Sequence, residues 1–233
     1  MPTIKDKIKW KLFELKRNIY ITQGLLHNKI RYYDDELIDN LSNIYYGGIP
    51  ASVSLLLPEL SNGKCYDRAL LLTTGFNSGD LFQIVRGNTA AIALNPMYVD
   101  RKKNDKYYAD HCVVERVEKD GTWVYDTSMC VKIERDYYYK MQQFDVRHIS
   151  SKYETQNYYE YQTILNADLE KDKYAALLTL PLVEEILKNT QSLYKDKVIK
   201  IINEFKEKIQ YNELYNQMIE DIKQKRKVTN NKR

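Results

Sequence analysis

The chain has 233 residues, 43% hydrophobic and 29% charged, which is typical of a folded globular protein and excludes global disorder. Its formal net charge is +4, and the only basic cluster is the C-terminal KQKRKVTNNKR, so we expect no nucleic-acid partner. No segment has the ~18 consecutive apolar residues of a membrane span, and no secretory signal is visible. Three cysteines without framework spacing argue against a disulfide scaffold and suit a reducing compartment, so we expect a cytoplasmic protein without a membrane partner.

The first part of the chain is expected to be helical. Apolar spacing predicts a helix over residues 4–20, with Ile4, Ile8, Leu12, Leu15 and Ile19 on one face. A second helix is predicted over Asp34–Tyr46, ending at Gly47-Gly48-Ile49-Pro50. Residues 51–60 fit either a short helix or a buried loop. A third helix is predicted over Gly63–Thr74, with Ser61 or Asn62 as its N-cap and Gly75 as its C-cap.

The middle of the chain changes to strand-like patterns. Branched and aromatic residues predict strands over Leu81–Arg86 and 90–94, followed by a polar surface loop over 95–108. The sequence then predicts a hairpin of His111–Val117 with Thr122–Asp126 and a further short strand, Val131–Glu134. After about residue 165 two charge-rich helices are expected, over Tyr174–Lys188 and Leu193–Lys225.

These elements predict an α+β protein in three regions. Residues 1–50 form an N-terminal helical region, residues 51–160 the core, and residues 161–233 a C-terminal helical extension with a frayed basic tail. The C-terminal helices either pack on the core or offer a surface to a protein partner. The 21 tyrosines, with runs such as Tyr137–Tyr139, line an aromatic binding surface or cap the core with their hydroxyls in water.

Cys65 is the first candidate site residue because it follows Asn62-Gly63 at the start of a predicted helix. The positive end of the helix dipole favours a thiolate, which is the reactive form of cysteine, and the free N–H groups there can face an oxyanion. A buried structural cysteine is the alternative. By itself the residue does not decide between them.

His111 and Asp126 add the other two groups of a nucleophile, base and acid set. If Val117 lies opposite Thr122 in the hairpin, paired residue numbers sum to 239, and Val113 lies opposite Asp126. His111 is then one diagonal step away on the same face, about 7–8 Å from Asp126 and within reach of a hydrogen bond. A two-residue turn keeps this arrangement, whereas a loop of three or five residues places the two side chains on opposite faces.

These segments resemble the transglutaminase-like superfamily over roughly residues 60–130. NGKCYDRALLL resembles its Gly-x-Cys-x-x-x-Ala segment, and DHCVVERVEKDGTWVYDTS resembles its block of a histidine strand, a turn and an Asp-Thr-Ser segment. The resemblance implies a papain-like core, in which a helix with the nucleophile packs on an antiparallel sheet, with helical N- and C-terminal additions. It also implies Cys65 as nucleophile, His111 as base and later acid, and Asp126 as the group that orients His111.

Some positions depart from this family or stay open. Val113 stands where the family often has an aromatic residue, and Trp123 matches the aromatic position of the Asp block as a wall of the site. The oxyanion donor cannot be placed, and Asn43, Tyr46 and Asn62 are candidates. Cys112 is expected to face the core from the opposite side of its strand. Zinc binding by Cys65, His111, Cys112 and Cys130 is the rival interpretation, but paired ligand spacing is absent, so no metal or cofactor is expected.

The residues and the resemblance together predict a cysteine enzyme that acts on an amide or acyl group of a peptide or protein through an acyl-enzyme. A peptidase or amidase is expected because water is the default acceptor. A protein-glutamine transglutaminase or deamidase is the alternative. Arylamine acetyltransferases share the order of the three groups, but nothing identifies a site for an acyl carrier. A binding module that retains the fold without activity is the non-enzymatic alternative.

Overall fold

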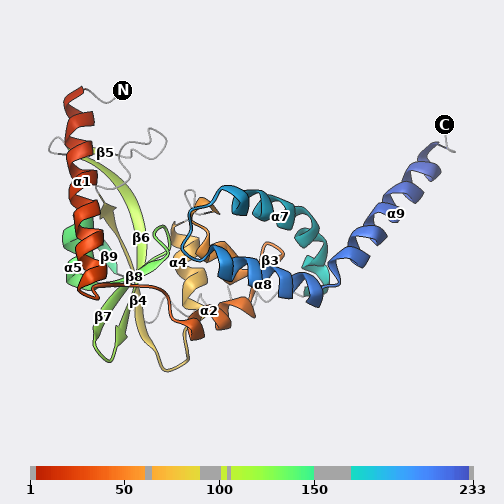
Figure 1. The fold of residues 1–233 in the computed structure, drawn as a ribbon, viewed down its shortest axis with the longest axis horizontal. Coiled ribbons are helices and arrows are strands. Elements are labelled where there is room, and N and C mark those ends of the chain that lie inside the picture. Colours follow the sequence, from red (N-terminus) through yellow and green to blue (C-terminus); the bar gives the residue numbers. More distant parts are fainter. Residues whose placement is uncertain (1–3, 61–64, 90–100, 104–105, 150–168, 231–233) are drawn as a thin grey trace.

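The structure is a computed structural model, and it describes residues 4–60, 65–89, 101–103, 106–149 and 169–230. It is an α+β arrangement in which helices cover both faces of one antiparallel sheet (Figure 1). The helices are α1 (Ile4–Leu26), α2 (Asp35–Ser42), α3 (Ala51–Leu56), α4 (Cys65–Thr73), α5 (Arg135–Gln142), α7 (Leu169–Asn189), α8 (Lys195–Lys208) and α9 (Tyr211–Asn230), with a 3-10 turn, η1 (Pro58–Leu60).

The sheet has the strand order β1-β8-β7-β6-β4-β9, and β5 pairs with β6 off this path. Every described pairing is antiparallel. Hairpins join β6, β7 and β8, whereas the connection from β8 to β9 at the other edge of the sheet contains α5. A separate two-stranded hairpin joins β2 to β3. The strands are β1 (Ile30–Arg31), β2 (Tyr45–Tyr46), β3 (Ile49–Pro50), β4 (Leu81–Thr89), β5 (Arg101–Lys103), β6 (Lys106–Glu118), β7 (Gly121–Asp126), β8 (Val131–Glu134) and β9 (Asp145–Ile149).

Two hydrophobic cores lie on the two faces of the sheet. On one face, α2, α3, α4, α7 and α8 pack against alternate strand residues that include Cys112, Val114 and Tyr125. On the other face, α5 and the end of α1 pack against Val113 and Val124. Figure 1 shows α1 and α5 on one side of the sheet, α2, α4, α7 and α8 on the other, and α9 projecting away from both.

The helices that the sequence predicts are present in the structure, but not all of them have the predicted length. The predicted helix at Asp34–Tyr46 ends at Ser42, because Tyr45–Tyr46 pairs with Ile49–Pro50 across Gly47 and Gly48, both at positive φ. Residues 51–60, which the sequence left open, form α3 and η1. The predicted helix at Leu193–Lys225 is wrong as one element, because Gln210 at φ 51 separates α8 from α9.

The strands differ more from the sequence prediction. The loop expected over 95–108 is wrong where it is described, because Arg101–Lys103 pairs with the start of β6. The predicted strand at 90–94 lies outside the described residues. The sequence also missed α5, which packs on one face of the sheet, and β9, which pairs with β4 at the edge of the sheet.

The predicted boundaries at residues 50 and 160 do not separate hydrophobic cores. A single core contains Leu41 from α2, Leu72 from α4, and Leu180 and Phe205 from α7 and α8. The N-terminal region also contributes β1 to the edge of the sheet beside β8. The helices α2, α7 and α8 therefore belong to the same packed unit as the strands. Among the described helices, none has the length and apolar character needed to cross a membrane.

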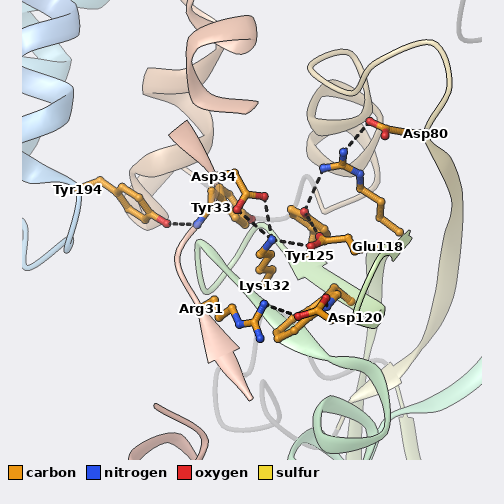
Figure 2. Close-up of polar contacts among 11 residues, drawn as sticks. Arg31, Tyr33, Asp34, Asp80, Glu118, Asp120, Tyr125, Lys132 and Tyr194 are labelled. Atoms are coloured by element: carbon orange, nitrogen blue, oxygen red, sulfur yellow. Dashed lines mark hydrogen bonds and ion pairs between the residues drawn. The ribbon is translucent and has the colours of Figure 1, made fainter. Parts of the chain in front are cut away.

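A charged network stabilises the β1 side of the sheet, on the face of the larger core (Figure 2). The ammonium of Lys132, which is 3% exposed, lies 2.8 Å from a carboxylate oxygen of each of Asp34 and Glu118. Glu118 also accepts a hydrogen bond of 2.5 Å from the Tyr125 hydroxyl. Lys132 thereby joins the segment before α2 to the two central strands.

We expect Lys132→Met to reduce the free energy of unfolding, because Glu118 then stays largely buried without its cation. The loss should be about 2 kcal/mol, below the 3–5 kcal/mol of a fully buried pair, because Asp34 is half exposed. Urea denaturation measures it. Lys188→Met, which breaks the exposed pair with Glu185, is the matched control and should leave the urea midpoint unchanged. Equal effects of the two substitutions would contradict this role of Lys132.

Candidate active site

His111 and Asp126 meet because of the register between β6 and β7. The hairpin pairs Val117 with Thr122 and Val114 with Tyr125, so paired residue numbers sum to 239 as the sequence predicts. The turn between Glu118 and Gly121 holds two residues, which preserves the predicted side-chain faces. Nε2 of His111 lies 3.1 Å from Oδ2 of Asp126, and both side chains are buried. The predicted diagonal contact is therefore confirmed.

Asp126 is held by hydrogen bonds from both sides of its carboxylate. Its Oδ1 accepts from the backbone N–H of Ser128 at 2.8 Å and from the Ser128 hydroxyl at 2.6 Å. Its Oδ2 accepts from the Tyr138 hydroxyl at 2.7 Å, in addition to the contact with His111. The Ser128 contacts form a local turn of the kind that aspartate favours at strand ends. The carboxylate of Asp126 is thus held in place by groups other than His111.

Aromatic side chains from α5 and the following turn cover the His111–Asp126 pair. Gly87 lies opposite His111 on β4, and a Cβ atom there would come within 2.9 Å of the Phe144 ring. Glycine therefore lets Phe144 pack close to the sheet beside His111. Phe144 contacts the rings of Tyr138 and Tyr139, at centroid distances of 5.6 and 5.4 Å. This cover keeps water from the pair, which strengthens its electrostatic interaction.

The two buried groups shift each other's pKa in opposite directions. Burial lowers the pKa of His111, but the charge and hydrogen bond of Asp126 outweigh burial and raise it above its ordinary value. Burial raises the pKa of Asp126, yet His111, Ser128 and Tyr138 together bring it below the usual range. The favoured state is an imidazolium beside a carboxylate, so His111 is a stronger base than a free histidine.

Cys65 lies at the first position of α4 and reaches His111 from the other face of the sheet. A hydrogen bond with the Cys65 thiol is among the causes that raise the pKa of His111. Because Asp126 takes Nε2, Nδ1 is the ring nitrogen left for the sulfur. The pairing of β7 with β6 ends at Tyr125, so β7 does not cover the part of β6 that holds His111. We infer that the start of α4 meets the imidazole at this gap.

Arg68, three residues after Cys65, ties the same helix to the segment that follows Asp126. Its guanidinium is buried and donates to three carbonyl oxygens: those of Ser54 and Leu55 in α3, and that of Thr127 at 3.0 Å. Burial lowers the pKa of this guanidinium, and nearby Cys130 and Tyr33 are among the groups that oppose that shift. One side chain therefore sets the position of α4 relative to both α3 and Asp126.

The other two cysteines have structural positions. Cys112 points into the larger core beside Cys65, as predicted, and burial raises the pKa of its thiol. Cys130 is buried next to α3, where its sulfur contacts the carbonyl oxygen of Leu55 at 3.1 Å. Burial raises the pKa of Cys130 to about 12. Both thiols are thus kept protonated, whereas Cys65 is half-buried.

The candidates for the oxyanion donor and the site wall have different outcomes. The structure places Trp123 away from the His111–Asp126 pair, with its indole N–H on Asp120 and the Arg31 guanidinium over its ring. Asn43 caps α2, and its amide donates to the Asp39 carbonyl. Tyr46 is half-buried and near enough to Arg68 to influence its pKa. Asn62 lies outside the described residues, as does Ser61, the other proposed N-cap of α4.

Within the described part of the chain, no group of three or more His, Cys, Asp or Glu side chains has the geometry of a metal site. A pocket of about 280 Å³ lies beyond Asp126, and neither Cys65 nor His111 lines it. It is bounded by Pro58, Glu59, Met129, Cys130, Gln191, Ser192, Leu193 and Tyr194.

Sequence reasoning missed Ser128, Tyr138 and Arg68. Ser128 had a visible signal, because a serine two residues after an aspartate commonly completes a local turn. Tyr138 had none, because the helix that carries it was not predicted. Arg68 lies one turn after Cys65. A charged residue in a helix is expected to face solvent, and only the packing against α3 shows that this one is buried.

No family model matches this chain, and comparisons with curated proteins and with solved structures found no significant match. The resemblance to the transglutaminase-like superfamily therefore rests on the motifs around Cys65, His111 and Asp126 alone. The α+β class and the antiparallel sheet are properties of this structure. The papain-like core is part of the proposal below.

The pKa of His111 should depend on the charge of Asp126. In Asp126→Asn the ring stays buried but loses its carboxylate, so the pKa of His111 should fall below its ordinary value instead of lying above it. An NMR titration of the histidine ring protons measures this, with the exposed His27 as an internal reference. An unchanged His111 titration would show that the carboxylate does not control the imidazole.

Arg68 should stabilise the packing of α4 on α3. Arg68→Met leaves three buried carbonyl oxygens without this donor, so the free energy of unfolding should fall by about 3 kcal/mol or more. Arg68→Lys should recover only part of the loss, because an ammonium cannot span the same three oxygens. Arg135→Met, at an exposed ion pair, is the control. Full recovery by lysine would refute the role of the guanidinium shape.

Proposed function

We propose that the protein is a cysteine enzyme that cleaves an amide or related acyl bond of a peptide or protein through an acyl-enzyme. The proposal rests on the 3.1 Å contact between His111 and Asp126 and on the Cys65 thiol, whose hydrogen bond is among the causes that raise the pKa of His111. A thiol, an imidazole and a carboxylate in this order activate a nucleophile. The family resemblance supports the same assignment and adds the papain-like core to it.

In the first half of the proposed reaction, the proton of the Cys65 thiol already lies on His111 as an imidazolium, and the thiolate sulfur attacks the carbonyl carbon of the substrate. The negative charge on the carbonyl oxygen is stabilised by backbone N–H groups in the first turn of α4, where the helix dipole is positive. His111 then donates its proton to the leaving amine as the carbon–nitrogen bond breaks. A thioester of Cys65 remains.

In the second half, an acceptor attacks the thioester while His111 removes the proton from the acceptor. The carbon–sulfur bond breaks, and the acyl group leaves on the acceptor. With water as acceptor the product is a carboxylic acid, and the enzyme is a peptidase or amidase. With an amine as acceptor the same site performs a transglutaminase reaction. Water is the acceptor that we propose, because it needs no second binding site.

Asp126 has a positioning role in this scheme. Its contact with Nε2 fixes the tautomer of His111 so that Nδ1 faces the sulfur, and its charge stabilises the imidazolium. Tyr138 and Ser128 hold the carboxylate in turn. The aromatic cover over the pair excludes water from the side opposite to the thiol, which keeps the proton between sulfur and nitrogen.

The proposal predicts that iodoacetamide at neutral pH alkylates Cys65 about tenfold faster than a free thiol, because the imidazole raises the thiolate fraction. Cys112 and Cys130 serve as internal controls, since both are buried, and peptide mass spectrometry separates the three sites. His111→Ala should bring the rate at Cys65 to that of a free thiol. A panel of fluorogenic peptide amides then tests turnover, with Cys65→Ser as the inactive control.

Two results would contradict the proposal. One is labelling of Cys65 at the rate of a free thiol in the wild-type chain. The other is amide hydrolysis that survives in Cys65→Ser. Fast labelling that depends on His111 without any turnover on the peptide panel would separate an activated thiol from the peptidase assignment and redirect the search toward amine acceptors.

A further inference from the structure

The outer face of α1 carries a stripe of aliphatic side chains that the fold does not bury. Its described members are Ile4, Ile8, Leu12, Leu15, Ile19 and Leu26, with exposed fractions of 79%, 56%, 56%, 58%, 49% and 75%. The opposite face of α1 is the one that packs on the protein. There Gly24 is buried beside Ile30, and the Tyr20 carbonyl accepts a 2.6 Å hydrogen bond from the Tyr137 hydroxyl. A contiguous exposed apolar stripe of this kind marks an interaction surface.

The spacing of the stripe indicates what fits it. From Ile8 to Leu26 the stripe positions follow a strict alternation of four and three residues, with Thr22 as the single polar member. This is the heptad spacing of a coiled-coil seam, which is narrower than the apolar face of a helix lying in a membrane surface. A single helix therefore matches the stripe better than a lipid surface.

The residues that flank the stripe select the charge of the partner. In the heptad that has Leu12 and Ile19 at a, the flanking e and g positions include Lys11 and Lys16, both exposed. The other flanking residues with described side chains from Lys11 to Leu25, namely Asn18, Gln23 and Leu25, carry no charge. In a parallel pair of α1 helices, Lys11 at g would face Lys16 at e of the second copy, and in neither orientation would these lysines meet an acidic residue among the described flanking residues. A second copy of the chain is thus disfavoured, and acidic e and g residues are favoured.

We infer that the outer face of α1 binds an amphipathic helix of a partner protein, with apolar residues at heptad spacing and acidic residues beside them. This surface differs from the one expected on the C-terminal helices. It is also independent of Cys65, so its failure would leave the proposed reaction untouched.

The test uses the full chain and a fluorescently labelled three-heptad peptide with leucine at a and d and glutamate at e and g. Its matched control peptide has lysine at e and g. Fluorescence anisotropy should show binding of the glutamate peptide at least about tenfold tighter than the lysine peptide, and weaker binding as salt increases. Leu12→Gln with Leu15→Gln should weaken binding at least about tenfold, because two buried contacts are lost.

A control variant and a charge reversal complete the test. Leu182→Gln on α7 changes a leucine that is exposed to the same extent, 58%, and should leave binding unchanged. Lys11→Glu with Lys16→Glu should reverse the preference between the two peptides. Absence of binding, or equal binding of both peptides, would overturn the inference. So would stripe-dependent binding to phosphatidylserine vesicles without peptide binding, or stripe-dependent dimerisation of the chain in sedimentation experiments.

Discussion

The hydrogen bond between His111 and Asp126 depends on the register of a single hairpin, and the rest of the candidate site is built around it. A shift of one residue between β6 and β7 would place the two side chains on opposite faces of the sheet. The two-residue turn fixes this register, and Ser128 and Tyr138 fix the carboxylate within it. Arg68 then brings the first turn of α4 to the same place by joining it to the carbonyl of Thr127. The site is therefore assembled by backbone register on one side and by one buried guanidinium on the other.

The sheet accommodates this assembly because different parts of the site pack on its two faces. The larger core holds α4 in place, while the smaller core places α5 and Phe144 over the imidazole and the carboxylate. Cys65 and His111 belong to opposite faces, and they meet where β7 stops covering β6. This explains how a thiol that is half-buried can contact a base that is almost fully buried. Cys112 and Cys130, by contrast, are buried in the larger core, and burial raises the pKa of both thiols and keeps them protonated.

Local patterns in the sequence predicted the parts of the site that depend on local rules. Strand alternation was enough for the diagonal pair of His111 and Asp126, and helix spacing was enough for α1 and α4. The elements that were missed depend on contacts between distant residues. α5 is a short, tyrosine-rich helix whose packing on the sheet is set by Tyr138 and Phe144. Arg68 looked like a surface residue because its three carbonyl partners lie in α3 and after Asp126. The exposed stripe of α1 shows the converse, because a helical apolar pattern predicts a helix without predicting that the fold buries it.

The central claim is that Cys65 and His111 share a proton as a thiolate–imidazolium pair, and the ultraviolet absorbance of the thiolate tests it most directly. The measurement compares the wild-type chain with Cys65→Ser at neutral pH, where the buried Cys112 and Cys130 stay protonated. The account predicts that the wild-type spectrum exceeds the Cys65→Ser spectrum by the absorbance of one thiolate, and that His111→Ala abolishes this difference. Identical spectra of the wild type and Cys65→Ser at neutral pH would contradict it.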